Sequence, residues 1–144
     1  MKKSIAILII ALMSMTACAD SKQQITYNDL PEKAQVFIAK YFDTAAISYV
    51  ERERDDFFVE YNVYLNDATK INFDHKGQLE SVDGHHKPLP QGIVPDAIAA
   101  YVAQHYPMAF IVEYSIDMHS QKVELSIELE LIFNLQGSFL RIDD

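Results

Sequence analysis

The sequence contains few of the residues that cross-link small folds or interrupt their helices and strands. It has 1 cysteine, no tryptophan, 4 glycines and 5 prolines among 144 residues. One cysteine excludes an internal disulfide framework, and no His or Cys spacing typical of a zinc site is present. So few glycines leave no glycine-rich phosphate-binding loop. Basic residues are also scarce, since 12 Lys and Arg face 21 Asp and Glu. The resulting charge of −9 argues against nucleic acid and anionic lipid surfaces as partners.

The remaining composition is that of a globular protein. Hydrophobic residues make up 49% of the chain and charged residues 23%. These proportions allow a real core, and the length suits one domain of ordinary size. We therefore expect a folded domain and not a disordered chain.

The first residues are typical of a bacterial secretory signal. Lys2 and Lys3 are followed by an apolar run over residues 5–13, which is too short to span a bilayer with margin. We interpret residues 1–19 as a signal peptide and expect an exported product in the periplasm or cell envelope. No later apolar stretch is long enough to cross a membrane, so no transmembrane helix is expected after the signal is removed.

Cys18 leaves two outcomes open for the mature N-terminus. As a lipobox, Met15-Thr16-Ala17-Cys18 would make Cys18 the first mature residue, lipidated on its sulfur. As an ordinary cleavage site, Ala17-Cys18-Ala19 would be removed with the signal. The protein is accordingly expected to be either soluble or tethered by an N-terminal lipid.

Two segments of the chain follow the same pattern. One opens with Leu30-Pro31-Glu32 and the other with Val94-Pro95-Asp96. Each is followed by an apolar stripe at helical spacing, and a proline near the first turn suits a helix start. The two stripes consist of Ala34, Phe37, Ile38, Tyr41 and Phe42, and of Ile98, Tyr101, Val102, His105 and Tyr106. Asp29 is the predicted cap of the first helix.

After each helix the hydrophobic period changes from helical to two, which predicts strands. The strands are expected over residues 47–54, 57–65, 71–73 and 78–83, and again over residues 111–119, 123–125, 129–133 and 139–142. The prediction is an α+β fold of two tandem repeats, residues 20–84 and 85–144, within one compact domain. Each repeat is a helix packed on an antiparallel meander of about four strands, with the two sheets side by side.

The same residues carry a resemblance to a known family. Leu30-Pro31, Leu65-Asn66-Asp67, Gly77, Leu89-Pro90 and Tyr106-Pro107, with their surroundings, resemble the PepSY-like, beta-lactamase-inhibitor-like family of exported bacterial proteins. The resemblance covers residues 25–144. It implies a helix-over-sheet fold and an exported location, and it brings no catalytic residues.

No residue pattern indicates catalysis. The serines lack a Gly-x-Ser-x-Gly elbow, and the tandem His85-His86 would point to opposite sides of an extended segment. We predict that the protein is not an enzyme and has no cofactor, no metal and no catalytic residue.

Alternation predicts two faces for the second expected strand. If Phe57, Val59, Tyr61 and Val63 face the helix, the intervening residues face away. The expected outer binding face consists of Phe58, Glu60, Asn62 and Tyr64, joined by Leu79 and Phe139. Apolar groups on an uncovered face indicate a partner or ligand, whereas contacts between the two repeats or mutual shielding of strand pairs would leave no site.

Two functions follow as hypotheses. The first is a non-enzymatic protein-binding or inhibitor-like module that engages another protein of the envelope. The alternative is a periplasmic small-ligand or cation-binding protein that uses an acidic open sheet face, to which Glu124, Glu128 and Glu130 would contribute.

Overall fold

The computed structural model describes residues 21–143, so the predicted signal segment, Cys18 and the last residue lie outside it. The described residues form an α+β fold with one nine-stranded antiparallel sheet and two α-helices. The strands are β1 (Ser21–Ile25), β2 (Ile47–Arg54), β3 (Val59–Leu65), β4 (Lys70–Phe73), β5 (Leu79–Asp83), β6 (Ile111–Ile116), β7 (Gln121–Leu125), β8 (Glu130–Phe133) and β9 (Phe139–Asp143). The helices are α1 (Glu32–Tyr41) and α2 (Asp96–His105), with short 3₁₀ turns η1 (Tyr27–Asp29) and η2 (Thr44–Ala46).

The sheet is continuous from β1 to β9, and its strands pair in chain order. Strands β5 and β6 join what the sequence predicted as two sheets side by side, through partners such as Val82 and Tyr114. Strand β1 was not predicted, because its five residues, Ser-Lys-Gln-Gln-Ile, are nearly all polar and show no apolar alternation. It pairs with β2 and forms one edge of the sheet.

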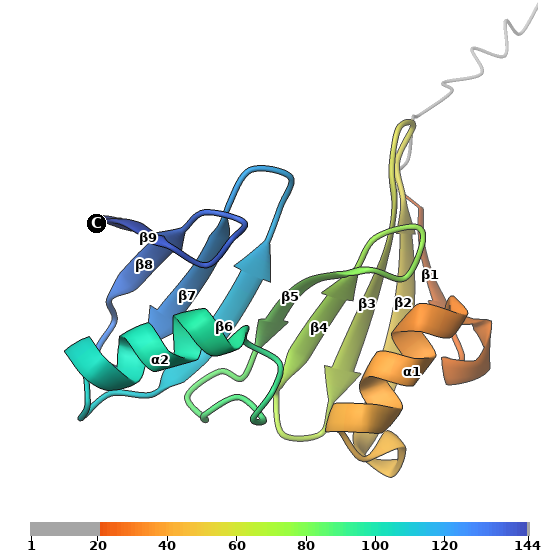
Figure 1. Cartoon of the computed structure of the whole chain (residues 1–144). Coiled ribbons are helices and arrows are strands. Elements are labelled where there is room, and N and C mark those ends of the chain that lie inside the picture. The colour runs from red at the N-terminus through yellow and green to blue at the C-terminus, as the bar shows by residue number, and fades with distance from the viewer. Residues whose placement is uncertain (1–20, 144) are drawn as a thin grey trace, which may run out of the picture.

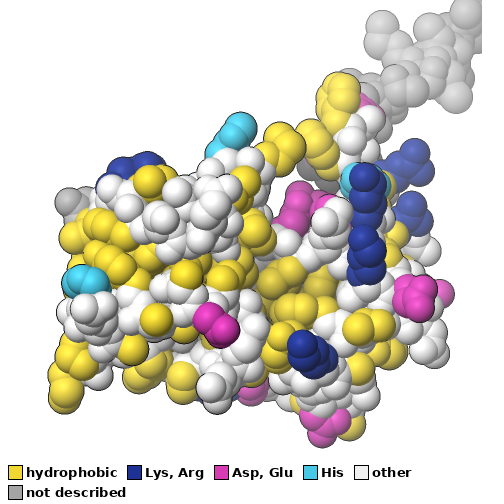
Figure 2. Space-filling model, in the orientation of Figure 1, with side chains coloured by type: hydrophobic (Ala, Val, Ile, Leu, Met, Phe, Trp, Pro, Cys, Tyr) yellow, Lys and Arg dark blue, Asp and Glu magenta, His cyan; other side chains and the backbone are white. Residues whose placement is uncertain are grey.

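Both helices lie over the same side of the sheet, α1 over the early strands and α2 over the late ones (Figure 1). The apolar stripe of each helix supplies the buried contacts, Ala34 and Ile38 from α1 and Ile98 and Val102 from α2. Figure 2 looks onto this side and shows hydrophobic side chains over and between the helices. We call this side of the sheet the helix face.

The core is a row of side chains that crosses the sheet under the helices. Each member is the direct partner of the next across the strands. The row consists of Val50, Val63, Ile71, Val82, Tyr114, Val123 and Leu131, all at most 4% exposed. Full burial of one such side chain contributes about 1.5–3 kcal/mol, so this row supplies much of the stability.

A tight turn after β4 and another after β8 support the beginnings of the helices. Gly77 has φ +79°, and a Cβ there would lie 2.7 Å from Cβ of Pro31. Gly137 has φ +86°, and its Cβ would lie 3.0 Å from Cβ of Ala97. Glycine is favoured at both turns, because the left-handed conformation and the close helix both oppose a side chain.

The predicted cap of the first helix is wrong. Asp29 lies in η1, where its Oδ2 accepts hydrogen bonds from the backbone N–H and the hydroxyl of Thr26 at 2.8 and 2.7 Å. The helix itself begins after Pro31, whose side chain provides no capping bond. These bonds from Thr26 hold the pKa of Asp29 below its usual value.

Candidate binding face

The side of the sheet opposite the helix face, which we call the outer face, carries the alternate residues of each strand. The structure places Glu60, Asn62 and Tyr64 of β3 on it, because they alternate with the buried Val63 and pair with outward residues of β2. In strands, neighbouring side chains point to opposite faces, so the buried row on one side fixes this polar set on the other.

Two of the residues expected on this face lie on the other side of the sheet. Leu79 pairs with the buried Phe73 and packs against the core. Phe139 stacks on Tyr101 of α2, with ring centroids 4.8 Å apart. Irregular pairing in β4–β5 and in β8–β9 shifts the alternation by one residue, which the sequence pattern did not reveal.

Phe57 and Phe58 are not part of a strand. They lie in the connection between β2 and β3, where Asp55 Oδ1 accepts hydrogen bonds from the N–H of both at 2.8 and 2.6 Å. Their side chains are 87% and 67% exposed. The prediction that Phe57 faces the helix is therefore wrong. The β2–β3 hairpin projects beyond the body of the sheet in Figure 1, so it presents two aromatic rings to solvent.

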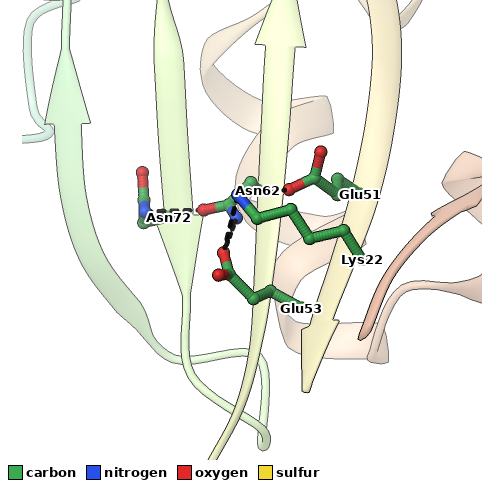
Figure 3. Close-up of polar contacts among 5 residues, drawn as sticks. All are labelled: Lys22, Glu51, Glu53, Asn62 and Asn72. Carbon is green, nitrogen blue, oxygen red and sulfur yellow. Dashed lines mark hydrogen bonds and ion pairs between the residues drawn. The ribbon is translucent and has the colours of Figure 1, made fainter. Parts of the chain in front are cut away.

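A polar network covers the outer face of the first four strands (Figure 3). Asn72 Nδ2 donates to Asn62 Oδ1 at 2.7 Å, and Asn62 Nδ2 donates to Glu53 Oε2 at 3.4 Å. Lys22 Nζ lies 3.5 Å from carboxylate oxygens of both Glu51 and Glu53, and these carboxylates raise its pKa. Asn62 is only 2% exposed, so neighbouring side chains on this face exclude water from it.

An aromatic pair adjoins this network. The rings of Tyr49 and Tyr64 stack with centroids 4.3 Å apart, and Lys70 Nζ lies 5.6 Å from the ring centroid of Tyr64. Tyr49 is 39% exposed, so one side of the stack is open to solvent. Tyrosines combine a large contact area with a polar hydroxyl, which is why they are enriched at protein interfaces.

The later strands carry a row of carboxylates at directly opposed positions. Each is the cross-strand partner of the next. The row, which we call the acidic row, is Asp83, Glu113, Glu124, Glu130 and Asp143. Burial raises the pKa of Glu113, and the charge of Asp83 adds to the increase. Lys122 Nζ partly offsets the negative charge through an ion pair of 3.2 Å with Glu130.

The sequence interpretation identified only part of this surface. Glu124 and Glu130 were recognised as exposed strand carboxylates, but Asp83, Glu113 and Asp143 were not connected with them, because only the pairing register brings the five into one row. Glu128 lies in the turn between β7 and β8 with φ +60°. Among residues 21–143, no three His, Cys, Asp or Glu side chains converge as a metal-ligand set. No helix in this part of the chain is long and apolar enough to cross a membrane.

Comparisons with known proteins agree with this architecture. A model of the family described as "Putative beta-lactamase-inhibitor-like, PepSY-like" matches residues 59–141. A "putative calcium-regulated periplasmic protein" of Bacteroides thetaiotaomicron is 32% identical, with a TM-score of 0.82 over 85% of this chain and 97% of that one. No curated protein matches the sequence.

Two further solved structures are similar over nearly the same length. A "putative periplasmic protein from DUF2874 family" of Bacteroides vulgatus is 35% identical, with a TM-score of 0.82 over 88% of this chain and 99% of that one. Another protein of the same species, described as a "putative periplasmic protein of unknown function", is 28% identical, with a TM-score of 0.80 over 88% of this chain and 100% of that one.

Proposed function

This chain belongs to the PepSY-like, beta-lactamase-inhibitor-like family, and from that premise we propose that it is a non-enzymatic protein-binding module of the cell envelope. The observation that carries the proposal is the outer face of the sheet, which neither helix covers. Its polar side chains are joined by hydrogen bonds and ion pairs, and its aromatic pair and the tip of the β2–β3 hairpin expose ring surface. Side chains that already contact one another lose less entropy on binding than free ones, which favours an interface here.

The location and the organisation of the chain form part of the proposal. The solved relatives are described as periplasmic proteins, and the sequence of residues 1–19 has the pattern of a signal peptide. Cys18 is then either lipidated or removed. The two halves, residues 20–84 and 85–144, are two tandem repeats within one compact domain. The common order of helix and four strands in α1 with β2–β5 and in α2 with β6–β9 supports this duplication.

The partner is expected to contact the hairpin tip and the aromatic pair together. Phe58 supplies an exposed ring, and Tyr64 supplies a ring that is already packed against Tyr49. Aromatic side chains of this kind contribute most of the affinity at many interfaces. The polar network beside them would set the specificity, because a partner that leaves these groups unpaired is penalised.

The test is site-specific photo-crosslinking in intact cells. A photoreactive residue is placed at position 58 or at position 64, and a matched control carries it at Met108, which is 94% exposed in the loop after α2. We expect one discrete adduct from positions 58 and 64 that is absent from position 108. The double variant Phe58→Ser, Tyr64→Ser should lose the partner in a pull-down while its melting temperature falls by only a few degrees.

Two results would contradict the proposal. Adducts of equal yield at all three positions would indicate nonspecific collisions. Strong destabilisation of the double variant would show that the rings serve the fold.

A second candidate function is cation binding by the acidic row. The observation that favours it is the raised pKa of Glu113, which means that burial and neighbouring charges destabilise its ionised form. A cation bound nearby would stabilise that ionised form. One solved relative is described as calcium-regulated. Against it, Ca²⁺ takes six to eight oxygen ligands, and the acidic row distributes its carboxylates along a line. Calorimetric titration with CaCl₂ decides, because a heat signal that Glu113→Gln abolishes would support a site on this row.

A further inference from the structure

A cavity lies on the helix face, at the edge of the sheet near η1. It measures about 650 Å³ and is bounded by Gln23 and Ile25 of β1, Thr26, Asp29, Arg52 of β2 and Tyr61 of β3. Its size is within the range of small-molecule sites. It opens on the side of the sheet opposite the outer face, so it is independent of the proposed partner surface.

Arg52 is the unusual member of this cavity. It shares the helix face with the buried Val50, two residues earlier on the same strand. Its Nε is buried, and no residue from 21 to 143 provides a hydrogen-bond acceptor for it. A buried donor without an acceptor destabilises a fold, so the fold alone gives no reason for a guanidinium here.

The second half of the sheet shows what the fold requires at the corresponding place. In the first half, Arg52 pairs with Tyr61, two residues along from the core pair of Val50 and Val63. In the second half, the position two residues along from the core pair of Tyr114 and Val123 is held by Ile116, opposite Gln121.

The polar member of that second pair is fully bonded. Gln121 Oε1 accepts from the Tyr114 hydroxyl at 2.7 Å, and Gln121 Nε2 donates to two backbone carbonyls. The second half therefore forms the same arrangement of strands with an apolar side chain and a fully hydrogen-bonded amide at this pair of positions. The fold does not require an arginine there.

The charges around the cavity restrict the ligand. Asp29 lines the same cavity as Arg52 but forms no ion pair with it, and both of its hydrogen bonds from Thr26 use Oδ2. A guanidinium binds a carboxylate through two parallel hydrogen bonds. A dianion such as phosphate would be repelled by Asp29, whereas a group with a carboxylate and an ammonium would meet an opposite charge on each.

We propose that this cavity binds a small zwitterion of the amino-acid or short-peptide class, with its carboxylate on the Arg52 guanidinium and its ammonium toward the Asp29 carboxylate. Gln23 and Thr26 supply the polar wall at the open end, and Tyr61 supplies the apolar side. The site is separate from the outer face and holds whether or not that face binds a protein.

The experiment is a titration of ¹⁵N-labelled protein followed by NMR. The probes are alanine, dialanine, acetate, alanine amide and inorganic phosphate. We expect alanine or dialanine to shift the amide signals of residues 23–29 and 52, acetate to act more weakly, and alanine amide to have no effect. Arg52→Gln should weaken binding roughly 10- to 100-fold, the factor that corresponds to one charged bidentate contact. Arg54→Gln is the matched control, an exposed arginine on the same strand outside the cavity.

Further variants separate binding from a structural role. Arg52→Ile copies the second half and should leave the melting temperature unchanged or higher, while it abolishes the shifts. Asp29→Asn keeps an acceptor for Thr26 and should weaken alanine more than acetate. The proposal is overturned if no carboxylate probe binds at millimolar concentration, if phosphate binds better than alanine, or if Arg52→Gln and Arg54→Gln behave alike. Partner adducts from position 58 should be unchanged in Arg52→Ile, which keeps this test distinct from that of the proposed function.

Discussion

The acidic row makes the fold less stable at neutral pH than its packing would allow. Glu113 lies in the middle of the row, directly opposite Asp83 on one side and Glu124 on the other. Each like-charge pair at directly opposed positions destabilises a sheet by about 0.2–1 kcal/mol. Removing the charge of Glu113 while keeping its shape should therefore raise the free energy of unfolding by about 1 kcal/mol at pH 7.

The pKa of Glu113 determines how the stability difference between Glu113→Gln and the wild type depends on pH. Burial and the charge of Asp83 raise the pKa of Glu113 above its usual value of 4.5, so the folded state holds this proton more tightly than the unfolded state. The destabilisation is complete above the folded pKa and disappears as the pH falls below about 4.5. Glu113→Gln should accordingly be more stable than the wild type at pH 7 and equal to it at pH 4.

Urea denaturation at both pH values measures the effect, and a gain of about 1 kcal/mol corresponds to about 4 °C in melting temperature for a domain of this size. Asp56→Asn is the control, because Asp56 is an exposed acid at the hairpin tip with no described hydrogen bond. If Glu113→Gln gives no gain at pH 7, or the same gain at pH 4, the row is not a source of electrostatic strain and the argument fails.

Three further predictions concern the fold. Gly77→Ala should cost about 1–3 kcal/mol in urea denaturation, because φ +79° and the contact with Pro31 both oppose a side chain; an unchanged midpoint would refute the helix–turn contact. Phe73→Ala should cost about 3–5 kcal/mol, since Phe73 is fully buried and its ring packs edge-on against Phe37; calorimetry showing less than 1 kcal/mol would contradict that core position. Hydrogen bonds from Lys87 and, next, from Thr69 lower the pKa of Asp67 to about 2, so their stabilising effect should be lost as the pH falls from about 4 to about 2; an acid titration of Lys87→Met should show a smaller step, because the Thr69 bonds remain, and a step of unchanged size would refute the role of Lys87.

The sequence was informative where its period matched a regular element. The helical stripes located α1 and α2, and alternation located β2 to β9 within a few residues. The sequence-based prediction failed where a strand was polar or where irregular strand pairing shifted the alternation of side chains. Strand β1 has no apolar alternation, and its edge position needs none. Leu79 and Phe139 were assigned to the wrong face, because irregular strand pairing moves the side chains that follow it to the other side.

The candidate site was only partly accessible from the sequence. Alternation placed Glu60, Asn62 and Tyr64 opposite the buried row, since that rule depends on one strand alone. The stack of Tyr49 on Tyr64 and the burial of Asn62 depend on register between strands, which a single strand does not contain.

The sequence by itself therefore determined the helices, strands β2 to β9 and the family resemblance, because each rests on local period and composition. The tertiary structure decided everything that needs two or more strands at once. Pairing of β5 with β6 made one sheet of nine strands, and pairing across five strands assembled the acidic row. It also left Arg52 without an acceptor beside Asp29. Register and packing decide which residues become neighbours in space. A single sequence does not indicate which residues far apart in the chain will be in contact.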